Sequence, residues 1–208
     1  MKSILYWFVL IVSIAVLVSS CASSDDSKTA STDNTSSSED SSTTTALEGT
    51  WVVSCFDDGG GNYLIKTLTV TGTEWVDKIE IHTDSSCATD KDKWEFTWGS
   101  LQIGETGTHD GSPTAKFTMT LGTSKYTPQT SALVSSANTN SWCGETDWVL
   151  NTAQSAAGKT CGSGTQWDTG QAVFGEYILD GNNLYWDYSS SEYPSVNTSS
   201  GYYTFTRQ

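Results

Sequence analysis

Apolar and polar side chains alternate with a period of two along much of the chain from residue 47 onward. In WEFTWG, for example, Trp94, Phe96 and Trp98 fall on one face of an extended backbone, and the intervening Glu and Thr fall on the other. The segments EWVDKIEIH and KFTMTLG alternate in the same way, which is typical of half-buried β-strands. About eight such strands, joined by turns, predict an all-β fold, either an up-and-down barrel or a sandwich. We favour the antiparallel barrel because closure removes exposed sheet edges.

One segment departs from the strand pattern. In TDWVLNTAQSAAG, residues 146–158, apolar and small side chains recur with the spacing of a helix face. Thr146 is suited to cap the start of a helix, and Gly158 is suited to end it. The sequence therefore predicts one short helix here, and a further turn of helix is expected within residues 130–140.

The first 20 residues have the pattern of a secretory signal peptide. Lys2 precedes an apolar run over residues 4–18, which is broken only by Ser13, and two small residues follow the run. The run is shorter than the roughly 20 apolar residues of a transmembrane helix. We therefore expect residues 1–20 to be removed on export.

Residues 18–21, Val-Ser-Ser-Cys, resemble a bacterial lipobox, in which the cysteine is acylated and becomes the new N-terminus. The resemblance implies a lipoprotein held on a membrane by palmitate-type acyl chains on Cys21, and stable anchoring takes more than one chain. Ala22, where inner-membrane lipoproteins carry Asp, resembles the outer-membrane class. The expected location is therefore the outer membrane of a bacterial cell envelope, facing the periplasm or the cell surface.

The rest of the chain divides by composition into a linker and a domain. After Cys21, residues up to 46 are mostly Ser and Thr with scattered acidic residues, so residues 21–46 are predicted to form a lipid-anchored, disordered linker. Residues 47–208 have the length of one domain.

Four cysteines follow Cys21. In an exported domain, Cys55, Cys87, Cys143 and Cys161 indicate two disulfides, for which three connectivities are possible. We favour Cys55–Cys87 and Cys143–Cys161, because the partners are neighbours along the chain and each pair brackets a compact segment. The closely spaced cysteine pairs of a zinc site are absent from the sequence, so no metal is expected.

LEGTW, residues 47–51, resembles the Gly-x-Trp opening of the lipocalin and calycin barrels. In that family the tryptophan closes one end of the barrel, and an arginine near the end of the chain packs across it. The resemblance implies that Trp51 and Arg207 form such a barrel plug. A wider resemblance to small bacterial lipoproteins with a lipocalin-like domain rests on GTWVVSC, DSSC, CGETDWVLN and GKTC. It implies a lipocalin-like barrel in the cell envelope.

Composition and motifs disfavour several activities. The net charge of −14 disfavours nucleic-acid binding, which needs clustered Lys and Arg. AQSAAGKT resembles a loose phosphate-binding loop, but it lies at the expected helix end, where the dipole repels phosphate. DDGGGN lacks the spacing of a calcium loop. His82 and His109 are the only histidines, and His82 alternates with Ile81 and is expected to be exposed. We therefore expect no enzyme and no cofactor.

An aromatic stripe supplies the candidate ligand site. The residues expected to line a cavity in the barrel are Trp75, Trp94, Phe96, Trp98, Phe117 and Met119. They would either enclose a small hydrophobic ligand or fill the barrel, and some Trp and Tyr side chains could instead be surface platforms for sugars. The predicted function is a non-enzymatic, lipid-anchored binding module for a small hydrophobic ligand. The alternative is an envelope interaction protein with a filled barrel.

Overall fold

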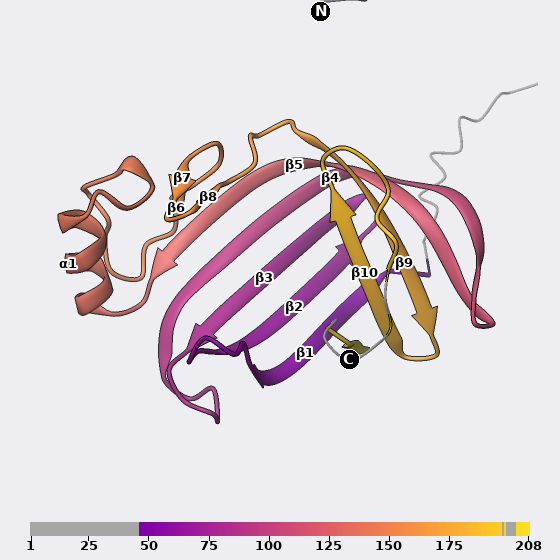
Figure 1. Ribbon diagram of the computed structural model, residues 1–208, viewed down its shortest axis with the longest axis horizontal. Coiled ribbons are helices and arrows are strands. Elements are labelled where there is room, and N and C mark those ends of the chain that lie inside the picture. The colour runs from indigo at the N-terminus through magenta and orange to yellow at the C-terminus, as the bar shows by residue number, and fades with distance from the viewer. Residues whose placement is uncertain (1–45, 197, 199–202) are drawn as a thin grey trace, which may run out of the picture. The chain divides into compact units, whose positions relative to one another are not determined.

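The computed structural model describes residues 46–196, 198 and 203–208 (Figure 1). The predicted signal peptide, the expected lipidation site Cys21 and the predicted linker up to residue 45 lie outside the described residues. In chain order the elements are β1 (Gly49–Asp57), β2 (Tyr63–Thr71), β3 (Glu74–His82), β4 (Asp90–His109), β5 (Ser112–Pro128), α1 (Ser131–Thr139), the 3₁₀ helix η1 (Trp142–Gly144), β6 (Gln154–Ser155), β7 (Thr160–Cys161), β8 (Gly164–Thr165), β9 (Ala172–Asp180), β10 (Asn183–Ser189) and β11 (Phe205–Arg207).

Eight of the strands form a closed antiparallel barrel. Strands β1, β2, β3, β4, β5, β9, β10 and β11 follow one another around it, and β11 pairs with β1 to close the ring. Trp51 is the register partner of Arg207 in that closing pair, and Val52 is the partner of Thr206. Each barrel strand therefore pairs with the next one along the chain, and the predicted up-and-down barrel is confirmed.

Large side chains fill the barrel around the start of β1. Trp51, Trp75, Phe117, Leu68 and Leu184 are fully buried there in one apolar cluster. Burying a side chain of this size contributes roughly 1.5–3 kcal/mol, so the cluster supplies much of the stability of the domain.

A glycine makes room for this packing. Gly175 on β9 is the register partner of Phe117 on β5, and a Cβ atom at position 175 would collide with the Phe117 ring. The ring therefore occupies the space that a side chain of β9 would otherwise take.

The helix predicted over residues 146–158 is wrong. That segment is mostly irregular and contains only the short strand β6. Its backbone groups bond to other parts of the chain: Trp148 N donates to Asn138 Oδ1 at 2.7 Å, and Ala156 N donates to the Ser124 carbonyl at 2.8 Å. The small and apolar side chains that suggested a helix instead meet their partners across the fold, as Trp148 and Ala156 are both buried.

The α-helix is α1, within the region where only a turn was expected. Thr130 caps it, with its Oγ1 accepting a hydrogen bond from Leu133 N at 3.2 Å. Together with η1 and the segment up to Cys161, α1 packs near the start of β4 and the end of β5. Figure 1 shows α1 beside the end of β5. In the part of the chain that the structure describes, no helix combines the length and apolar character needed to cross a membrane.

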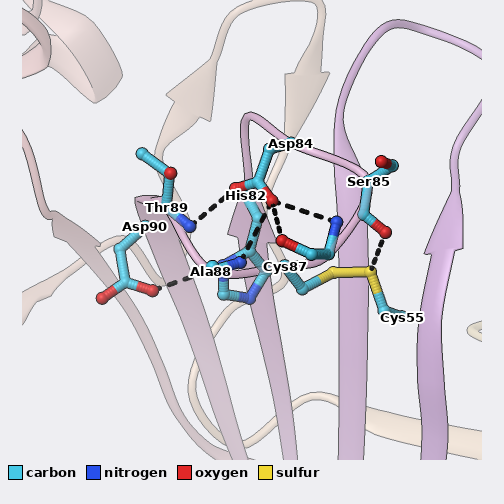
Figure 2. Close-up of a disulfide and its surroundings, with 9 residues drawn as sticks. Cys55, His82, Asp84, Ser85, Cys87, Ala88, Thr89 and Asp90 are labelled. Atoms are coloured by element: carbon cyan, nitrogen blue, oxygen red, sulfur yellow. Dashed lines mark hydrogen bonds and ion pairs between the residues drawn. A yellow bond between two sulfur atoms is a disulfide. The ribbon is translucent and has the colours of Figure 1, made fainter.

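Both expected disulfides, Cys55–Cys87 and Cys143–Cys161, are present. Figure 2 shows the first, which ties β1 to the loop between β3 and β4. Asp84 organises this loop by accepting hydrogen bonds from Ser86 N at 3.0 Å and from Thr89 N at 2.7 Å. A further hydrogen bond from the Ser86 hydroxyl, together with the one from Thr89, holds the pKa of Asp84 well below its usual range.

His82 is buried, so the expectation that it is exposed is wrong. Only 4% of the residue is accessible, because the loop fixed by Asp84 and Cys87 folds back over it (Figure 2). Its Nδ1 lies 3.3 Å from Oδ1 of Asp90, although the geometry is not that of a hydrogen bond. A loop of the chain, rather than the barrel core, buries this ring.

Candidate ligand site at the barrel mouth

One end of the barrel is closed by Trp51 and Arg207. The Arg207 guanidinium carbon lies 4.2 Å from the centre of the Trp51 ring. Its Nη1 donates to the Glu48 carbonyl at 3.1 Å, and its Nη2 donates to the Ala46 carbonyl at 2.6 Å. Trp51 Nε1 in turn donates to the Leu47 carbonyl at 2.7 Å. These contacts give partners to the Trp51 indole N–H and to both terminal nitrogens of the Arg207 guanidinium, and they hold the two side chains across this end of the barrel.

The six residues predicted to line a cavity divide into three groups. Trp75, Phe117 and Met119 are packed in the core, and the Trp75 and Phe117 rings stack with their centres 5.3 Å apart. Trp94 packs against Tyr126 in the second apolar cluster, near α1. Phe96 and Trp98 line cavities.

Two adjoining cavities lie toward the end of the barrel opposite Trp51. We call them the mouth cavities. The first, of about 290 Å³, is lined by Lys66, Asp77, Ile79, Phe96, Trp186, Asp187, Tyr188, Tyr203 and Phe205. The second, of about 230 Å³, is lined by Phe96, Trp98, Leu121, Thr165, Gln166, Trp167 and Tyr188. Phe96 and Tyr188 line both cavities, so the cavities adjoin at these two side chains.

Two charged side chains reach the first mouth cavity from inside the barrel. Asp77 is 2% exposed, and its Oδ1 has no hydrogen-bond partner among the described residues. Burial raises the pKa of Asp77 to about 6, although the nearby Lys66 ammonium opposes the rise. Burial also lowers the pKa of Lys66, and the carboxylates of Asp77 and Asp187 oppose that change. The interior of the barrel therefore holds an acid and a base whose charged forms are both disfavoured by burial.

Aromatic rings surround this pair. The Lys66 ammonium lies 4.2 Å from the centre of the Tyr203 ring and 5.7 Å from the centre of the Phe205 ring, a favourable arrangement for a cation. The pKa of Tyr188 is raised by burial and by the negative charges of Asp77 and Asp187. Tyr188 is therefore a neutral hydroxyl that can donate a hydrogen bond at physiological pH.

Lys66 and Asp77 were not among the predicted site residues, although the alternating pattern of β2 and β3 places both at inward positions. Asp77 shares a face of β3 with Trp75 and Ile79, and Lys66 shares a face of β2 with Leu68. A charged residue at an inward position of an alternating strand is thus a signal that the sequence contains.

The described residues, 46–196, 198 and 203–208, contain no group of three or more His, Cys, Asp or Glu side chains placed to hold a metal ion. His82 lies under the disulfide loop and His109 lies at the β4–β5 turn, 3.6 Å from the Asp110 carboxylate. Compared with models of known protein families and with curated proteins, the sequence matches none.

Proposed function

We propose that this protein is a lipid-anchored binding module of the bacterial cell envelope, which holds a small amphipathic ligand in the mouth cavities of its barrel. The lipobox-like segment ending at Cys21 supports the anchor. The two disulfides support an oxidising compartment outside the cytoplasm. An eight-stranded barrel is of a size that can hold one small ligand.

The observation that carries this proposal is Asp77, a carboxyl group buried beside the first mouth cavity, with the half-buried Lys66 nearby. Taking ionic groups out of water costs several kcal/mol per ion, and apolar residues of similar volume are often at least as stable. A barrel that served only as a packed scaffold would gain nothing from an Asp77 oxygen that no described residue satisfies. A ligand group that donates a hydrogen bond to Asp77 would satisfy that oxygen.

The cavity walls define the rest of the ligand. Phe96 and Trp186 offer apolar ring faces, while Lys66 and Tyr188 offer donors for a polar group of the ligand. Each cavity is smaller than the roughly 300 Å³ at which drug-sized ligand sites begin. The ligand is therefore a small molecule, or one end of a longer apolar chain, with its polar group next to Asp77.

The packed half of the barrel favours a second candidate function, an envelope interaction protein without a small-molecule ligand. Trp75, Phe117 and Met119 are fully buried in the core, and they line neither mouth cavity. This candidate predicts that the mouth cavities contain only water.

Native mass spectrometry separates the two functions. The Cys21→Ala chain, exported by its own host and purified without detergent, should retain an extra non-covalent mass. The matched variant that also carries Lys66→Met and Asp77→Leu should lose that mass and remain folded by circular dichroism. An unliganded mass for both chains would support the filled barrel and reject ligand binding.

A further inference from the structure

A third cavity lies between α1 and the neighbouring ends of two barrel strands, near the start of β4 and the end of β5. We call it the helix cavity. It measures about 450 Å³ and is lined by Lys91, Asp92, Tyr126, Leu133, Ser136, Ala137, Asn140 and Trp142. Its residues come from β4, β5, α1, the residue after α1, and η1, and it shares no lining residue with the mouth cavities. It is therefore a separate place in the fold and needs its own explanation.

Asp92 is the central polar group of this cavity. The residue is 7% exposed, and its Oδ2 accepts a hydrogen bond from the Tyr126 hydroxyl at 3.1 Å. Its Oδ1 has no hydrogen-bond partner among the described residues. The Lys91 ammonium, although next in sequence, donates to Asn62 Oδ1 at 2.5 Å. Asp92 thus keeps one buried acceptor unused, which is unfavourable unless a ligand or another group completes it.

Trp142 carries a buried hydrogen-bond donor that complements the acceptor of Asp92. Its Nε1 is also buried without a hydrogen-bond partner among the described residues, whereas a buried indole N–H usually finds one. The neighbouring Trp148 follows that rule, since its Nε1 donates to the Trp142 carbonyl at 3.0 Å. The helix cavity is therefore lined by one side chain with an unused acceptor and another with an unused donor.

The walls between these two groups are aromatic and aliphatic. The rings of Tyr126 and Trp142 lie with their centres 6.2 Å apart, and Leu133 and Ala137 of α1 complete the lining. A ligand that fits must have an apolar face and must carry both a hydrogen-bond donor and an acceptor.

These requirements exclude several classes of small molecule as ligands of the helix cavity. A protonated amine can donate to Asp92 but cannot accept from Trp142. A carboxylate or phosphate would face the negative charge of Asp92, and a purely apolar molecule would leave both polar atoms without partners. A sugar ring meets every requirement, because each hydroxyl both donates and accepts and the C–H face of the ring packs on aromatic side chains.

We propose that the helix cavity is a saccharide site, which binds one neutral sugar unit through a hydroxyl that donates to Asp92 Oδ1 and another that accepts from Trp142 Nε1. Neighbouring protein atoms cover both of these atoms in the structure. Binding therefore includes a rotation of the Asp92 and Trp142 side chains toward the cavity that they line.

Saturation-transfer NMR tests the site on the whole protein, with D-galactose, D-mannose and N-acetyl-D-glucosamine as separate probes. At least one sugar should receive saturation from the wild-type protein. Asp92→Asn, which puts an amide in place of the carboxylate, and Trp142→Phe, which removes only the indole N–H from a ring of similar shape, should each weaken binding about tenfold or more. Lys66→Met, in the mouth cavities, should leave sugar binding unchanged and serves as the matched control.

A further variant tests the location without removing a polar group. Leu133→Trp would fill the helix cavity from α1 and should abolish sugar binding, while circular dichroism reports whether the fold is kept. Absence of transfer to all three sugars would overturn the proposal, as would binding that survives Asp92→Asn, Trp142→Phe and Leu133→Trp. Loss of sugar binding on Lys66→Met would place the sugar in the barrel mouth and would also overturn it. Retention of a mouth ligand is measured independently, so either proposal can fail alone.

Discussion

Arg207, the last residue of β11, lies across the ring of Trp51 near the start of β1, with 4.2 Å between the guanidinium carbon and the ring centre. The same two residues are register partners in the strand pair that closes the barrel. A single residue therefore performs three tasks: it pairs the last strand with the first, covers the tryptophan, and binds the carbonyls of Ala46 and Glu48.

Replacing Arg207 by Ala should lower the free energy of unfolding by about 1–3 kcal/mol. The substitution removes a cation–π contact, worth about 0.5–2 kcal/mol, and two hydrogen bonds from a charged group. Urea denaturation measures the change. Arg207→Lys is the control and should recover part of the loss, since the ammonium can cover the ring but cannot serve both carbonyls. Equal stability of wild type and Arg207→Ala would contradict the role of the plug.

Because of Asp77, the domain should be more stable at mildly acidic pH than at neutral pH. Its pKa is 3.8 in the unfolded chain and about 6 in the folded protein, so the folded state binds more protons between these values. The free energy of unfolding should therefore fall as pH rises from about 4 to about 6, by on the order of 2–3 kcal/mol from this group.

Asp77→Asn isolates that contribution, because the amide keeps the shape of the side chain and does not titrate. Other carboxyl groups also respond to pH, among them Asp92, whose pKa burial raises. The informative quantity is therefore the difference in urea midpoint between wild type and Asp77→Asn across this pH range. A constant difference would show that the carboxyl of Asp77 titrates normally in the folded state.

Gly175→Ala should destabilise the barrel by roughly 1–3 kcal/mol. A Cβ atom there meets the Phe117 ring, and cores that must take up an extra methyl group typically lose this much. Gly99→Ala is the matched control on β4, because a Cβ atom at position 99 meets no atom within 4 Å. Thermal unfolding should give a clearly lower melting temperature for Gly175→Ala than for Gly99→Ala. Similar melting temperatures would mean that Phe117 moves aside without loss of stability.

The disulfide Cys55–Cys87 should protect His82 as well as stabilise the fold. The chain-entropy relation gives roughly 3–4 kcal/mol for a loop of this length. Diethyl pyrocarbonate should modify His109, whose side chain is 46% exposed, far faster than His82, whose side chain is 6% exposed. In the Cys55→Ser, Cys87→Ser double variant, His82 should become reactive as the loop opens. Unchanged protection of His82, measured by peptide mass spectrometry, would mean that Asp84 alone holds the loop.

Cys21→Ala should release the protein from the membrane. The acyl chains implied by the lipobox-like segment would be lost, and the linker and domain would leave with the soluble envelope fraction. Fractionation with immunodetection measures the distribution, and Ser20→Gly, which keeps a small residue before Cys21, should remain membrane-bound. Continued membrane association of Cys21→Ala would reject the anchor.

The strand pattern of the sequence determined the all-β class and the buried face of each strand, because alternation with a period of two assigns each side chain to a face. Trp75, Phe117 and Met119 all lie on the buried face expected of them. The disulfide pairs also followed from their order in the chain, since neighbouring cysteines close the shorter loops. These features depend on local spacing alone, which the sequence displays directly.

The position of the helix and the character of the site were decided only by tertiary structure. The spacing around Trp148 suits a helix, but hydrogen bonds to Asn138 and β5 outweigh that local preference. His82 occupies an outward position of its strand and is buried because a loop fixed by a distant cysteine covers it. Lys66 and Asp77, which line one cavity, come from different strands, and so do Tyr126 and Asp92, which share a hydrogen bond. Contacts of this kind arise from closure of the barrel and from the fold of the segment beside it, and no local pattern encodes them.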